Sequence, residues 1–124
     1  MIEPAQKFIE TIEKLIYNFA KKFIEMKTKH SEYYFNLLKK HKGELSNKYG
    51  ISRIGIFGSV ARGMHNFESD VDVCIEMQKP DMMAFVGVYY DLENLFGKKV
   101  DVVRISKYTN PILKKRIEKE AIYV

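Results

Sequence analysis

The sequence predicts a small α/β domain in which a mixed sheet carries helices on one face. Three apolar runs, at 51–57, 71–77 and 99–105, have the length and the β-branched content of strands. Helical patterns precede the first run and separate the second from the third. The 124 residues suit a single domain with a modest core. We therefore expect a sheet of three strands or slightly more, with the helices packed on it.

The first 49 residues are predicted to be helical. Pro4 suits the first turn of a helix, and apolar residues then recur at helical spacing as far as about Lys27. These residues are Phe8, Ile9, Ile12, Leu15, Ile16, Phe19, Phe23 and Ile24. Ser31 could cap a second helix that ends near Lys48. Because no proline interrupts residues 5–49, one long bent helix is the alternative.

The later helices are marked by their end signals. Asp81 is expected to begin a helix that ends at Gly97. Asn110 and Pro111 form a cap followed by a first-turn proline, and they predict a last helix. Residues 65–69, between the first two predicted strands, are expected to form a loop.

Two carboxylates and a small turn are the chemically informative features of the chain. Gly58 and Ser59 directly follow the first predicted strand, and Asp70 and Asp72 stand at the start of the second. Side chains at i and i+2 of a strand point to the same face, so the two aspartates should aim at one point. Carboxylates that close repel each other unless a cation joins them or one is protonated. Beside a turn that can hold phosphate, Mg²⁺ is the expected cation; a strand-start cap is the alternative for the aspartates.

A third acid, Asp101, lies in the middle of the third predicted strand. A charge inside such an apolar run is costly to bury unless it is paired or bound to metal. Asp101 could therefore complete the site, or it could be a structural partner of Arg53 or Arg104. The sequence does not set the register that would decide between these interpretations.

Residues 54–73, IGIFGSVARGMHNFESDVDV, resemble the signature of the DNA polymerase beta superfamily of nucleotidyltransferases. The ending at 115–124 resembles that of the minimal nucleotidyltransferases, which often serve as antitoxins beside a HEPN-domain ribonuclease. The resemblance covers roughly residues 45–124. It implies a nucleotidyltransferase fold there, with residues 1–44 forming an N-terminal helical extension.

The resemblance also implies roles for individual side chains. Asp70 and Asp72 match the aspartates that bind two Mg²⁺ ions in the family. Asp101 matches the third carboxylate, which helps to hold the catalytic metal and can accept the proton of the attacking hydroxyl. All three would then be catalytic residues and metal ligands, with ATP as the substrate.

Gly58 and Ser59 match the pair that holds the phosphates of the nucleotide in the family. Arg62 also matches, and its guanidinium could bind a phosphate with two hydrogen bonds. Pairing with a nearby carboxylate is the alternative for Arg62. His65 lies in the loop expected over the site, where we interpret it as a solvated histidine.

The predicted function is Mg²⁺-dependent transfer of AMP from ATP to a protein hydroxyl. By resemblance, the acceptor is a tyrosine of a HEPN toxin, which would be silenced as a ribonuclease. One alternative is a nucleotidyltransferase that acts on RNA or on a small molecule, although 124 residues leave little room for a further substrate-binding domain. The other is an antitoxin that acts mainly by binding its toxin.

Composition restricts the partners and the compartment. The net charge is +5, and residues 1–50 contribute ten lysines against six glutamates. The lysines are dispersed, which favours a solvated helix face over a nucleic-acid site. Cys74 is the only cysteine, and neither a membrane span nor a signal peptide is recognised, so a cytoplasmic location is expected. The apolar face of the first helix could pack on the protein's own sheet, on a second copy or on a partner.

Overall fold

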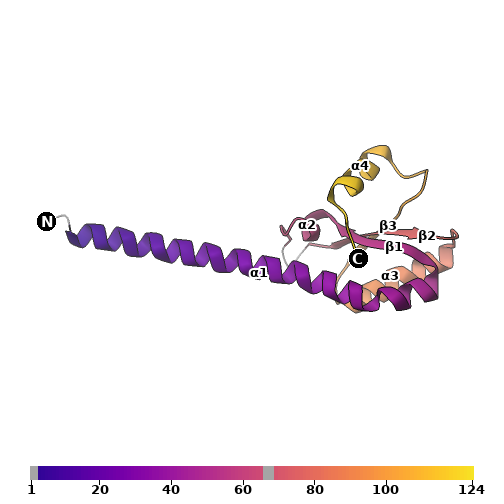
Figure 1. Ribbon diagram of the computed structural model, residues 1–124, viewed down its shortest axis with the longest axis horizontal. Helices are drawn as coiled ribbons and strands as arrows, with labels where there is room; N and C mark the ends of the chain where they lie inside the picture. Colours follow the sequence, from indigo (N-terminus) through magenta and orange to yellow (C-terminus); the bar gives the residue numbers. More distant parts are fainter. Residues whose placement is uncertain (1–2, 66–68) are drawn as a thin grey trace.

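The computed structural model describes residues 3–65 and 69–124, and its most prominent element is one long helix. This helix, α1 (Glu3–Tyr49), runs for 47 residues. Its first part projects away from a body that contains all the other elements, as Figure 1 shows. Across the described ranges, none of the helices combines the length and the apolar character needed to cross a bilayer.

The continuity of α1 decides between the two helical alternatives. Residues 27–30 contain neither proline nor glycine, and the helix passes through them without a break. Ser31 is not a cap: it lies inside the helix, is buried, and donates a hydrogen bond from Oγ to the carbonyl of Val60 at 3.0 Å. The expected second start is therefore wrong, because a tertiary contact satisfies the hydroxyl that suggested a cap.

The sheet has four strands in the order β3-β2-β1-β4. They are β1 (Ile51–Phe57), β2 (Val71–Met77), β3 (Val100–Arg104) and β4 (Ile122–Tyr123). Strand β1 pairs antiparallel with both β2 and β4, whereas β2 pairs parallel with β3. The expectation of a mixed sheet of three strands or slightly more is confirmed. The short strand β4, which pairs with Gly55 and Ile56, has no recognisable pattern in the sequence.

Two of the three remaining helices begin at their predicted caps, whereas the short helix expected to start at about Val60 begins at Gly58. The three helices are α2 (Gly58–Ala61), α3 (Met82–Phe96) and α4 (Pro111–Glu120). The Asp81 carboxylate accepts hydrogen bonds from the N–H groups of Met83 and Ala84, and Gly97 ends α3 in the left-handed conformation. The Asn110 side chain accepts a hydrogen bond from the N–H of Ile112 at the start of α4.

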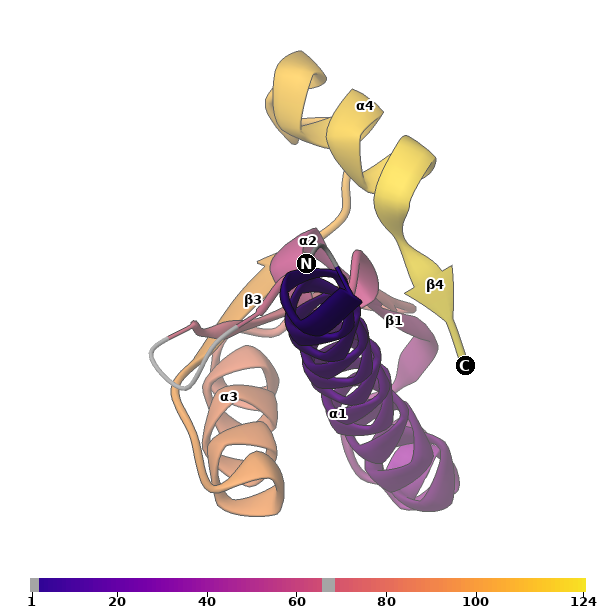
Figure 2. The same ribbon diagram turned by 90° about the vertical axis from the view of Figure 1, so that its left-hand side faces the viewer.

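Helices cover both faces of the sheet, which corrects the expectation of a single covered face. Alternate residues of each strand point to opposite sides. On one side, Leu38 of α1 and Leu92 of α3 belong to the main buried core with the inward residues of β1 and β2. On the other side, Ile117 of α4 packs with Phe57 and Cys74. Figure 2 shows α4 across the sheet from α1 and α3.

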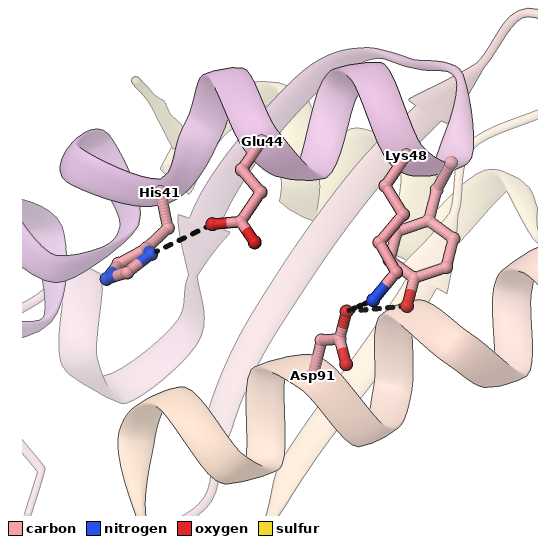
Figure 3. A network of polar contacts seen from close by, with 5 residues as sticks. His41, Glu44, Lys48 and Asp91 are labelled. Carbon is pink, nitrogen blue, oxygen red and sulfur yellow. Dashed lines mark hydrogen bonds and ion pairs between the residues drawn. The ribbon is translucent and has the colours of Figure 1, made fainter.

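Polar contacts also hold α1 against α3. Lys48 Nζ lies 3.1 Å from Asp91 Oδ2, and the Tyr49 hydroxyl donates a hydrogen bond to the same oxygen (Figure 3). Earlier in α1, His41 Nδ1 faces Glu44 at 3.6 Å. The hydrogen bond from Tyr49, together with Lys48, lowers the pKa of Asp91 below its usual value. These side chains border a shallow cavity of about 340 Å³ between the two helices, which we interpret as a product of this packing.

Candidate active site

The chain turns sharply where β1 ends, and this turn lies directly against a carboxylate. Phe57 is the last residue of β1, and it pairs with Asp72 in the antiparallel register of β1 and β2. Gly58 follows with φ +73°, a conformation that favours glycine. A Cβ atom at Gly58 would lie 3.0 Å from Asp72 Cγ and would overlap Oδ2. Only a glycine fits between this turn and the aspartate.

Strand pairing brings the second and third carboxylates together. Asp72 of β2 is the register partner of Asp101 of β3 in the parallel pair. Partners in adjacent strands lie about 5 Å apart and present their side chains to the same face. That face is the one covered by α4, because the neighbouring residues Val71 and Val100 point into the main core on the opposite side.

The negative charge of Asp70 also acts on Asp72. The pKa of Asp72 is raised, first by burial and then by the negative charges of Asp101 and Asp70. The positive charges of Arg116 and Arg62 oppose this rise but do not cancel it. Asp70 and Asp101 thus lie near enough to Asp72 for their charges to make its ionisation less favourable.

The donor set fits a hard divalent cation. Carboxylate oxygens are the ligands that Mg²⁺ prefers, and a bound cation would offset the mutual repulsion that raises the pKa of Asp72. Within residues 3–65 and 69–124, no three Asp, Glu, His or Cys side chains already converge as a complete metal-ion site. A cation would thus be bound with some adjustment of these side chains and with additional ligands from substrate phosphates or water.

Arg62 and Arg116 lie near the carboxylates, and both form ion pairs with Glu120. Arg62 lies 2.9 Å from one carboxylate oxygen of Glu120, and Arg116 Nε lies 3.3 Å from the other. Burial would raise the pKa of Glu120, but its hydrogen bonds and charge interactions with the two arginines lower it. The Arg116 guanidinium also lies 5.8 Å from the centre of the Phe57 ring. Glu120 thus holds two positive groups near the end of β1.

Some side chains around the site have partners that the sequence pattern did not predict. Arg62 pairs with a carboxylate in the structure, which agrees with the alternative stated for it. Arg116 and Glu120 had no predicted role, although their i, i+4 spacing on one helix could have suggested a pair. The role of Ser31 as an anchor was also missed: its bond to the carbonyl of Val60 ties α1 to α2, one residue after Ser59.

His65 differs from its prediction as a solvated loop residue. It is only 6% exposed, and its ring meets that of Tyr34 edge to face at 5.9 Å between centroids. The histidine therefore belongs to the packing between α1 and the end of the turn after α2. Residues 66–68 of the predicted loop lie outside the described residues.

The sequence left open that Asp101 is a structural partner of Arg53, but Arg53 pairs with Glu76 instead. Arg53 Nη1 lies 3.7 Å from Glu76, and its guanidinium stacks 3.6 Å above the centre of the Tyr123 ring. Asp101 itself is exposed. The arginines whose charges act on the neighbouring Asp72 are Arg62 and Arg116, and pairing of Asp101 with Arg104 stays the other alternative.

Comparisons with known proteins identify the family of this chain. The model of a family described as nucleotidyltransferase domain matches residues 38–124. Protein adenylyltransferase MntA of Thermococcus cleftensis is 36% identical over 90 residues, which cover 72% of this chain and 90% of the relative. MJ1379 of Methanocaldococcus jannaschii, named for a proposed protein adenylyltransferase activity, is 38% identical over 91 residues, covering 71% and 91%.

Solved structures share the fold. One that is provisionally described as a minimal nucleotidyltransferase superposes with a TM-score of 0.54 at 28% identity, covering 80% of this chain and 93% of the other. A toxin–antitoxin structure with AMP-PNP gives a TM-score of 0.58 at 18% identity, covering 68% and 69%.

Proposed function

The chain belongs to the nucleotidyltransferase domain family, and from this premise we propose that it transfers AMP from ATP to a hydroxyl of a partner protein. The observation that carries the proposal is the cluster of Asp70, Asp72 and Asp101 directly beside Gly58. Such a cluster suits chemistry at a phosphate, where negative charge must be neutralised and the attacking oxygen must be held in line.

The carboxylates would hold the metal. Asp70 and Asp72 would bind Mg²⁺, and two ions suit a reaction in which both the attacking and the leaving oxygen need support. When bound, the metal supplies positive charge at the phosphate undergoing attack. Asp101, which is exposed next to Asp72, would help to hold the ion and would accept a proton from the incoming hydroxyl.

The turn after β1 would receive the triphosphate. Gly58 has no side chain, so its backbone can approach a phosphate closely while it packs against Asp72. Ser59 offers both a hydroxyl and a backbone N–H next to it. Arg62 and Arg116, both paired with Glu120, add positive charge on the side of α4.

We further propose that the acceptor is a tyrosine of a HEPN ribonuclease toxin and that the chain acts as its antitoxin in the cytoplasm. Two findings support this: a relative named protein adenylyltransferase MntA, and structural neighbours described as toxin–antitoxin complexes. The division into a helical extension at 1–44 and a catalytic unit at 45–124 stays a prediction, since α1 crosses that boundary as one helix.

The test combines label transfer with toxin activity. The full chain, MgATP labelled at the α-phosphate and the candidate HEPN protein are incubated together, and the label on the toxin and its ribonuclease activity are both measured. We expect labelling and loss of ribonuclease activity, and neither with an Asp70→Asn, Asp72→Asn variant. Labelling of RNA or a small molecule instead would contradict the acceptor assignment. Equal silencing by the variant would identify an antitoxin that acts by binding.

A further inference from the structure

The first half of α1 exposes a continuous apolar surface that the body does not cover. We call it the apolar stripe; its side chains are between 40% and 74% exposed. They are Phe8, Ile9, Ile12, Leu15, Ile16, Phe19 and Phe23. Phe19 and Phe23 stack on each other at 6.4 Å between centroids. Because this part of α1 points away from the sheet (Figure 1), the alternative in which the stripe folds back onto the protein's own sheet is wrong.

The size of the stripe is that of an interface. Large apolar side chains expose roughly 150–250 Å² each when free, so the stripe presents about 700 Å². Isolated apolar patches on monomeric proteins are usually no larger than about 300–600 Å². Two such stripes facing each other would bury about 1,400 Å², which is within the usual range for a specific protein–protein interface.

The charges along the first half of α1 do not oppose the pairing of two apolar stripes. Residues 4–13 carry Lys7, Glu10 and Glu13, a net charge of −1. Residues 14–23 carry three lysines and no acid, a net charge of +3. Two residues turn a helix by about 200°, so Glu10 and Lys14 lie opposite Ile12, and Lys21 lies opposite Phe19. A contact through the apolar stripe of a second copy therefore leaves these charges in solvent on both chains.

We propose that the chain forms a homodimer in which the apolar stripe of α1, within residues 4–23, packs against the same stripe of a second copy. This segment is about 30 Å long, enough for five to six helical turns of contact. The contact lies on the part of α1 that projects from the body, so the proposed site near β1 and α4 is not part of it.

A matched pair of substitutions on one helix tests the stripe. Leu15 is 62% exposed within the stripe, and Tyr17 is 66% exposed on the opposite side of the same helix, because two residues turn a helix by about 200°. We expect the full chain to have twice its 14.6 kDa monomer mass by light scattering at about 50 µM. Leu15→Glu should weaken association at least 100-fold, since a carboxylate would enter the interface. Tyr17→Glu should leave the mass unchanged.

Circular dichroism checks that both variants stay helical, as expected because glutamate is a good helix former. A monomeric wild-type chain would overturn the proposal and assign the stripe to a different protein. Equal effects of the two substitutions would overturn it as well, because the stripe would then have no special role.

Discussion

The Cα of Gly58 packs directly against the carboxylate of Asp72, and the space between them has no room for a side chain. A Cβ atom at Gly58 would overlap Asp72 Oδ2. The contact follows from the register that pairs Phe57 with Asp72, so the proposed phosphate-binding turn and the proposed metal-binding strand cannot shift independently. One residue therefore joins the two halves of the proposed site.

This contact makes Gly58→Ala a severe change. Asp72 would have to move, and a displacement of about 1 Å can lower the rate of a reaction about 100-fold. The positive φ adds strain of about 1–2 kcal/mol to the folded state. We expect transfer activity to fall at least 100-fold and the melting temperature to decrease. Gly43→Ala is the control: nothing lies within 4 Å of its Cβ position in α1, and stability should hold or rise.

Removing two charges from the carboxylate cluster should separate activity from stability. We expect Asp70→Asn with Asp72→Asn to lower transfer about 1,000-fold or more, because the proposed metal ligands are lost. The melting temperature in EDTA should hold or rise, since repulsion within the cluster is relieved. Asp81→Asn serves as the control, because asparagine caps a helix as well as aspartate does. A collapse of stability in the double variant would indicate a structural role.

The pH dependence of stability should have opposite signs at two aspartates. The pKa of Asp72 is raised by folding, so its carboxylate destabilises the fold at neutral pH and this effect disappears as the pH falls through the raised pKa. The pKa of Asp91 is lowered, so its carboxylate stabilises the fold above the unfolded pKa and this is lost in acid.

Thermal unfolding without metal would show this contrast. At pH 7 we expect Asp72→Asn to raise the melting temperature and Asp91→Asn to lower it. Both differences should shrink toward about pH 3, where carboxyl groups are protonated in the unfolded chain. Shifts of the same sign in both variants would contradict the assignment of Asp72 to a repulsive cluster.

Ser59→Ala should have an intermediate effect on transfer. The variant keeps its backbone N–H and loses only the hydroxyl, whose hydrogen bond to a charged phosphate is worth about 1.5–3 kcal/mol. This corresponds to roughly a 10- to 150-fold decrease in rate. Steady-state kinetics with saturating MgATP would measure it. A loss as large as that of the double aspartate variant would mean that Ser59 also binds the metal.

Local patterns in the sequence were sufficient for much of the fold. The strands at 51–57 and 71–77 have the predicted bounds, and the caps at Asp81 and Asn110 form as expected. The spacing of Gly58, Ser59, Asp70 and Asp72 along the chain is enough by itself to indicate a carboxylate site beside a turn. These features depend on residues that are near one another in the chain, where the periods of strands and helices and the chemistry of turns apply directly.

Contacts between distant residues required the folded molecule. The register that sets Asp101 beside Asp72, the meeting of Arg62 and Arg116 on Glu120, and the burial of His65 against Tyr34 all join separate elements. Strand β4 is too short for a periodic pattern, and it forms because β1 offers a free edge. In each case the partner is chosen by packing and pairing across the whole chain, which local propensity does not encode.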